Sequence, residues 1–126
     1  MNEFNRKRLI SLKHAFSGLA YVFRTQKNTR VYLVFTILVL AFAFFLNVSW
    51  LEWIILLLLI GLVWAAECIN TAIETGIDLV TQDFHPIAKI AKDTSAAGVL
   101  MLALTAALIG IYIFGRHIYL IIFSGG

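Results

Sequence analysis

Apolar residues recur with helical spacing along most of this chain, and charged residues interrupt them at only a few places. Between residues 9 and 23 the apolar side chains fall on one helical face, while serine, lysine and histidine fall on the others. This pattern predicts a basic amphipathic helix over 9–23, which in a membrane protein lies flat among the lipid headgroups. The polar segment 24–30 ends the pattern.

Three longer apolar segments follow, and each predicts a helix that crosses the membrane. Residues 31–46 contain no charge, and neighbouring residues supply the remaining length of the first helix. Ser49 and Glu52 have the spacing of a capping box, which predicts the start of the second helix. Pro86 suits the first turn of the third. The three helices are expected at about residues 29–47, 50–81 and 87–122. The expected fold class is an all-α membrane protein, with residues 1–126 forming one domain.

Composition supports the membrane interpretation. Of 126 residues, 61% are hydrophobic and 13% are charged, and the mean hydropathy is +0.91. A soluble domain of this size carries about twice that charged fraction, so much of the surface must face lipid. The one cysteine, Cys68, excludes an internal disulfide and any cysteine-based zinc site. The basic N-terminus precedes a mixed segment, so we expect no cleavable signal peptide.

The positions of the basic residues predict the orientation of the chain in the cell membrane. Seven of the ten lysines and arginines precede residue 31, two more (Lys89 and Lys92) lie between the second and third helices, and none lies between the first and second. Because cytoplasmic loops are enriched in Lys and Arg, the N-terminus is expected in the cytoplasm and the C-terminus outside. Since topology accounts for these charges, nucleic-acid binding is not expected.

Four polar residues of the second helix share one face. They are Glu67, Asn70, Glu74 and Asp78, spaced by three, four and four. The rise from Leu51 to Glu67 is about 24 Å, against a hydrocarbon thickness of about 30 Å. Glu67 is therefore expected near the inner membrane boundary, where a lipid hydroxyl meets a water-soluble cosubstrate, whereas a transporter's acid would lie nearer the midplane. The alternative is a solvated helix end whose acids merely face water.

A second polar cluster lies where the third helix begins, and it contains His85, Lys89, Lys92 and Asp93. Paired cations near acids suit a polyphosphate bound through a divalent metal, because the metal takes carboxylate and phosphate oxygens and lysine balances the charge of phosphoryl transfer. Lys89 is equally consistent with a topology-determining charge, and His85 with an interfacial residue or a helix cap. Asp93 lies so close to the spanning segment that it requires a partner. Cys68 fits a small packing residue better than a nucleophile.

Three segments together resemble the bacterial diacylglycerol kinase/undecaprenol kinase family of small membrane lipid kinases. They are Ala66–Glu74, His85–Pro86 and Ala91–Val99. No Walker loop or glycine-rich kinase loop occurs in the sequence. The resemblance implies phosphorylation of a membrane lipid hydroxyl, with ATP as phosphoryl donor and Mg²⁺ as cofactor, by a homotrimer whose active sites are shared between subunits. Segment Arg24–Arg30 and His85–Pro86 look more like the undecaprenol-preferring branch, and diacylglycerol is the alternative substrate.

The resemblance also implies roles for individual residues. Glu67 would be the general base on the lipid hydroxyl, and Asn70 would position phosphate or substrate. Lys92 would contact the transferring phosphate, and Asp93 would orient it. Arg30 would contribute to the lipid-substrate site.

A metal and nucleotide site is implied in the same way, with Glu74 as a metal ligand. The implied nucleotide site contains Gln26, Glu74, Asp78, His85, Lys89, Lys92 and Asp93. Many family members have glutamate where this chain has Gln26, and that residue helps to bind the metal. Gln26 offers a neutral amide oxygen, so one formal charge is lost from the metal cage. Either the affinity for Mg²⁺ is lower, or another acid or water compensates.

The residues by themselves leave other classes of function open. A small transporter could use Glu67 as its ionisable centre, although nothing acidic marks the outer half of the first or third spanning helix. A non-catalytic adaptor could recruit partners through the basic N-terminal helix. Three short helices cannot both surround the acidic face and wrap an ATP, so we expect an oligomer.

Overall fold

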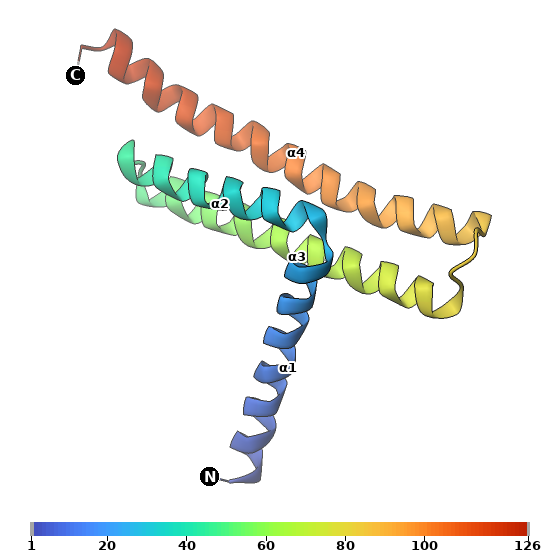
Figure 1. Ribbon diagram of the computed structural model, residues 1–126. Coiled ribbons are helices and arrows are strands. Elements are labelled where there is room, and N and C mark those ends of the chain that lie inside the picture. Colours follow the sequence, from blue (N-terminus) through green and yellow to red (C-terminus); the bar gives the residue numbers. More distant parts are fainter. Residues whose placement is uncertain (1, 126) are drawn as a thin grey trace.

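A computed structural model describes residues 2–125, and in this range the chain forms four α-helices joined by short connections (Figure 1). The helices are α1 (Glu3–Thr25), α2 (Lys27–Phe45), α3 (Trp50–Val80) and α4 (Pro86–Phe123). By length and composition, α2, α3 and α4 are each able to cross a membrane. The expected all-helical class with three long apolar helices is therefore confirmed.

The helix ends follow the local signals in the sequence. Ser49 Oγ accepts a hydrogen bond from the Glu52 amide (3.3 Å), and Glu52 Oε2 accepts one from the Ser49 amide (2.8 Å). This reciprocal pair is the predicted capping box, and it starts α3. Just before it, Asn47 adopts a positive φ of 52° in the tight connection from α2, a conformation that asparagine tolerates better than most residues. Pro86 occupies the first turn of α4.

Helix α1 stands apart from the other three. It begins at Glu3, earlier than the expected start at residue 9, because the Asn2 side chain caps it by accepting from the Asn5 amide (3.1 Å). In Figure 1, α1 leaves the bundle at a steep angle to α2, α3 and α4. Of its residues only Val22 is buried, and its apolar side chains, among them Phe16, are exposed.

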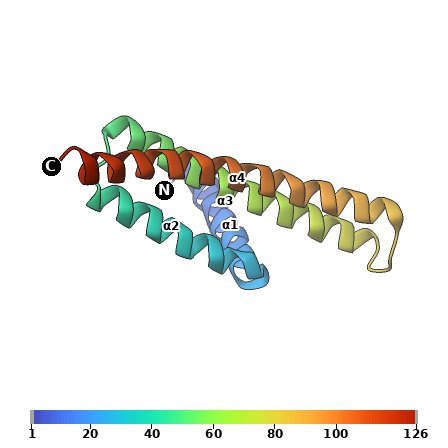
Figure 2. The same ribbon diagram turned by 90° about the horizontal axis from the view of Figure 1, so that it is seen from above.

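The three apolar helices differ in length, and this difference determines where the polar residues lie relative to the membrane. At about 1.5 Å per residue, α2 is about 28 Å long, close to the ~30 Å of bilayer hydrocarbon. Helices α3 and α4 have 31 and 38 residues and are therefore longer than that thickness. Figure 2 shows that they extend together past the start of α2 toward the connection between them. When α2 fills the hydrocarbon, this extension lies outside it.

Contacts between the helices concentrate on α3. It packs along much of α4. At the end where α3 begins, Glu52 Oε2 lies 2.9 Å from His117 Nε2 of α4. A small apolar core of Ala43, Val48, Leu56 and Ile113 lies near this end.

One tryptophan joins α3 to both of the preceding helices. The indole of Trp64 donates a hydrogen bond to the Thr36 hydroxyl of α2 (3.0 Å) and stacks on Phe23 of α1, with ring centroids 6.1 Å apart. At the corner between α1 and α2, the buried Thr29 hydroxyl donates to the Val22 carbonyl (3.3 Å). These contacts fix the corner against α3.

Candidate active site

The polar face of α3 starts in a buried environment and ends in an exposed one. Glu67 and Asn70 are 3% and 6% exposed, whereas Glu74 is half-buried and Asp78 is exposed. A carboxyl group that is buried in an apolar part of a small protein is costly to retain. Such groups concentrate at functional sites, so Glu67 is the leading candidate for a chemical role.

Asn70 is held between two other helical positions. Its Oδ1 accepts a hydrogen bond from the Ser95 hydroxyl of α4 (2.7 Å), and its Nδ2 donates to Glu74 Oε1 (3.4 Å). Because the amide oxygen accepts from Ser95 of α4, the amide nitrogen is the group that faces the Glu74 carboxylate one turn along α3. The structure therefore brings together two of the expected site residues, Asn70 and Glu74.

Two ion pairs lie beyond this network. Lys92 of α4 pairs with Asp78 of α3, and Lys89 pairs with Asp93 one turn further along α4. Asp93 thus has the partner that its position requires, but in the single chain the partner is Lys89, because residues four apart share a helical face and adjacent residues do not. All four side chains are between 38% and 64% exposed, so these pairs add little to stability and their charges remain accessible to a ligand.

The other expected site residues lie around the ends of α1, α2 and α4. His85 caps α4, because its Nδ1 accepts a hydrogen bond from the Ile87 amide (3.2 Å). Gln26 connects α1 to α2, and its backbone N–H donates a hydrogen bond to the Val22 carbonyl (3.0 Å). Arg30 is exposed in the first turns of α2. Within residues 2–125, no hydrogen bond or ion pair joins the side chain of Gln26 or Arg30 to the polar face of α3.

The side chains of the single chain offer a partial set of metal ligands. Among the described residues, no three His, Cys, Asp or Glu side chains converge in the manner of a protein metal cage. Mg²⁺ is commonly bound by one or two carboxylates together with substrate phosphate and water. Glu74, half-buried beside Asn70, fits this smaller requirement.

Two contributors to the site region received no individual role from the sequence. Ser95 positions Asn70, and Trp64 lies three residues before Glu67 and links α1, α2 and α3. The available signal for Ser95 was a small polar residue at the start of an otherwise apolar segment. A tryptophan in a membrane helix gives no comparable signal.

These features define a membrane protein whose polar, partly buried site lies where apolar helices give way to charged ones. Residues 13–114 match the model of the prokaryotic diacylglycerol kinase family, and the chain belongs to this family. It is therefore a membrane lipid kinase, an enzyme class that uses ATP as phosphoryl donor. The transporter and the non-catalytic adaptor are accordingly set aside.

Individual relatives carry two different substrate names. The chain is 40% identical over 113 residues to an undecaprenol kinase of Bacillus subtilis, a match that covers 90% of this chain and 91% of the relative. It is 38% identical over 103 residues to a diacylglycerol kinase of Synechocystis, covering 81% of this chain and 59% of the relative. A diacylglycerol kinase of Helicobacter pylori (strain J99) is 31% identical over 123 residues, covering 94% and 90%.

Proposed function

We propose that this enzyme phosphorylates undecaprenol at the cytoplasmic face of the membrane and produces undecaprenyl phosphate. One observation carries the choice of lipid: the relative named undecaprenol kinase is 40% identical and matches almost the full length of both chains. Diacylglycerol is the second candidate, because the Synechocystis relative with that name is nearly as similar.

The proposed reaction transfers the terminal phosphoryl group of ATP to the lipid alcohol. The Glu67 carboxylate accepts the hydroxyl proton, a new bond forms between the alcohol oxygen and the γ-phosphorus, and the bond from that phosphorus to the β,γ-bridging oxygen breaks to release ADP. Because phosphoryl transfer needs positioning and charge stabilisation more than covalent assistance, a few side chains at the membrane boundary suffice. The burial of Glu67 supports its role as the base.

The remaining roles are those that the family resemblance implies for each residue. Asn70, held by Ser95, positions the phosphate or the alcohol, and Lys92 contacts the phosphate in transfer while Asp93 orients it. Arg30 contributes to the lipid site. The nucleotide site contains Gln26, Glu74, Asp78, His85, Lys89, Lys92 and Asp93. Bound Mg²⁺ would balance phosphate charge, and Glu74 and Gln26 are the residues that would hold it.

The arrangement in the membrane and the assembly belong to the same proposal. The N-terminus lies in the cytoplasm, α1 lies along the inner surface, and the C-terminus lies outside. The steep angle between α1 and the bundle supports a surface position for α1 (Figure 1). A homotrimer would supply the groups that one chain lacks around Glu74, since no hydrogen bond joins the Gln26 and Glu74 side chains within residues 2–125.

Phosphate transfer from labelled ATP, measured in detergent micelles with undecaprenol and diacylglycerol in parallel, tests both the lipid and the base. We expect undecaprenol to be phosphorylated with a kcat/KM at least about tenfold higher. Glu67→Gln should still bind ATP but lose about 10²–10⁴-fold in kcat. Glu3→Gln, which changes an exposed carboxylate of α1, is the matched control and should remain active.

Each part of the proposal has its own contrary result. A clear preference for diacylglycerol would overturn the choice of lipid and leave the reaction class intact. Full activity of Glu67→Gln would remove that residue from the base role.

A further inference from the structure

The corner between α1 and α2 holds the backbone of Gln26 on both sides. The Gln26 N–H donates to the Val22 carbonyl (3.0 Å), and the Gln26 carbonyl accepts from the Thr29 N–H (3.3 Å). Gln26 is the last cap of α1 and the first cap of α2, yet within the described residues its side chain makes no capping hydrogen bond to α2. The backbone of this residue is therefore fixed, and its side-chain amide is left for a ligand.

A buried threonine hydroxyl closes the same corner. The Thr29 side chain is 0% exposed, and its hydroxyl donates to the Val22 carbonyl seven residues earlier (3.3 Å). A valine side chain would fill almost the same space, and burying a hydroxyl in place of a methyl group costs free energy unless the hydroxyl is hydrogen-bonded. What threonine adds here is thus a bond from the first turn of α2 to the last turn of α1, across Gln26.

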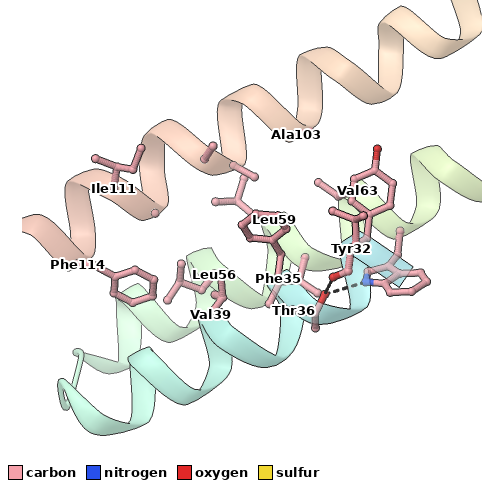
Figure 3. Close-up of a pocket in the computed structure, with 16 residues that line it drawn as sticks. Tyr32, Phe35, Thr36, Val39, Leu56, Leu59, Val63, Ala103, Ile111 and Phe114 are labelled. Carbon is pink, nitrogen blue, oxygen red and sulfur yellow. Dashed lines mark hydrogen bonds between the residues drawn. The ribbon is translucent and has the colours of Figure 1, made fainter. Parts of the chain in front are cut away.

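The corner is attached to α3 through one aromatic side chain. The Phe23 ring, next to Val22, stacks on the Trp64 indole with ring centroids 6.1 Å and ring planes 8° apart. Trp64 Nε1 donates to the Thr36 hydroxyl (3.0 Å), and a dashed line marks this bond at Thr36 in Figure 3. The indole therefore contacts α1 with its face and α2 with its nitrogen. Because Trp64 lies three residues before Glu67 on α3, these contacts fix the corner relative to the polar face.

We infer that Thr29 and Trp64 are positioning residues for Gln26, and that they set the place at which its side-chain amide meets the bound Mg²⁺. This inference rests on the proposed function, which gives Gln26 to the metal site. A neutral amide lacks the charge of a carboxylate, and ordering a flexible ligand costs conformational entropy. A backbone that is already fixed lowers this cost, in the way that groups orienting a metal ligand contribute to metal affinity.

The first test removes the Thr29 hydroxyl and keeps the side-chain volume. Thr29→Val should raise the Mg²⁺ concentration for half-maximal rate about threefold to tenfold, the factor for one lost hydrogen bond, and leave kcat at saturating Mg²⁺ unchanged. Thr29→Ser keeps the hydroxyl and should retain the original Mg²⁺ requirement. Thr25→Val is the matched control, because the Thr25 hydroxyl lies beside Gln26 but bonds within α1, to the Tyr21 carbonyl (2.8 Å).

Amide hydrogen exchange provides a readout that needs neither metal nor nucleotide. In the enzyme without Mg²⁺ and ATP, the backbone N–H groups of residues 26 and 29 should exchange about threefold to tenfold faster in Thr29→Val, because the corner opens more often. The same groups should exchange at the original rate in Thr25→Val and in Thr29→Ser.

A second variant tests the attachment to α3. Trp64→Phe removes the indole N–H, keeps an aromatic ring against Phe23, and should raise the Mg²⁺ requirement in the same way. Trp50→Phe is its control, since Trp50 also lies on α3 and is 76% exposed. Gln26→Ala should raise the Mg²⁺ requirement by itself. In that background neither Thr29→Val nor Trp64→Phe should raise it further, because both residues act through Gln26.

The contrary outcomes separate the inference from the proposed function. A further rise in the Gln26→Ala background, or a lower kcat at an unchanged Mg²⁺ requirement, would show a general structural role and overturn the positioning of Gln26. Unaltered hydrogen exchange in Thr29→Val would exclude Thr29. If Thr29→Val does not fold, Trp64→Phe and its combination with Gln26→Ala decide the question. An unchanged titration for Gln26→Ala alone would remove Gln26 from the proposed metal site, and the inference with it, before any corner variant is compared.

Discussion

The Ser95 hydroxyl donates a 2.7 Å hydrogen bond to Asn70 Oδ1, and this contact joins α4 to α3 beside the buried Glu67. It fixes the amide so that Nδ2 faces Glu74. We predict that Ser95→Ala lowers kcat about fivefold to tenfold, the factor for one lost hydrogen bond, because the amide is free to rotate. Steady-state kinetics with the proposed lipid substrate measures this change.

Thr94→Ala is the control for the Ser95 variant. Thr94 is the neighbouring residue and is exposed, so its hydroxyl does not face the α3 network. Equal losses of kcat in the two variants would show a general effect on α4 and would contradict the positioning of Asn70 by Ser95.

Substitutions at Glu74 and Gln26 should shift the Mg²⁺ requirement in opposite directions. Glu74→Gln removes the carboxylate proposed to hold the ion, and the Mg²⁺ concentration for half-maximal rate should rise about tenfold or more. Gln26→Glu adds the charge that many family members have at this position and should lower that concentration. Magnesium titrations at fixed ATP measure both effects.

Asp83→Asn serves as the control for this pair, since Asp83 is an exposed acid in the connection between α3 and α4. It should leave the titration unchanged. Superimposable titrations for Glu74→Gln and the unsubstituted enzyme would remove Glu74 from the metal site.

Glu52 and Glu67 lie at opposite ends of the apolar part of α3, and they should respond differently to substitution. Glu52 Oε2 accepts from the Ser49 amide and lies 2.9 Å from His117 Nε2, so its contacts are structural. Glu52→Gln should lower the free energy of unfolding by about 1–2 kcal/mol and keep kcat within about twofold. Thermal unfolding in detergent and the kinase assay, run on the same preparation, measure both quantities.

For this variant the exposed Glu3→Gln is again the comparison, and it should leave the unfolding temperature unchanged. A large loss of kcat at unaltered stability would mean that Glu52 takes part in the reaction.

The sequence predicted the elements whose signals are local. Charge-free apolar segments gave the three long helices, and the capping box at Ser49 and Pro86 gave two of the helix starts correctly. The start of α1 was missed because its first two turns depend on the Asn2 cap and an i,i+4 pair of Glu3 with Lys7, which hydrophobic periodicity does not register.

The site was only partly accessible from sequence for a different reason. Helical spacing placed Glu67, Asn70 and Glu74 on one face, and that arrangement is present in the structure. The pairing of Asn70 with Ser95 depends on how α3 and α4 pack, which no spacing within one helix reveals. The functional roles of these residues stay predictions.

The unequal attachment of the three apolar helices has a consequence for how a lipid enters. Helices α3 and α4 are joined at three levels, by Glu52 with His117, Asn70 with Ser95 and Asp78 with Lys92, so they are expected to move as one rigid unit. Helix α2 packs much less extensively against α4 than α3 does, and it is therefore expected to be more mobile than either of them. A lipid that enters from the bilayer is therefore expected to pass between α2 and α4, while the corner that carries Gln26 stays held against α3. The lipid can then exchange with the bilayer without disturbing the α3–α4 unit that carries the polar site.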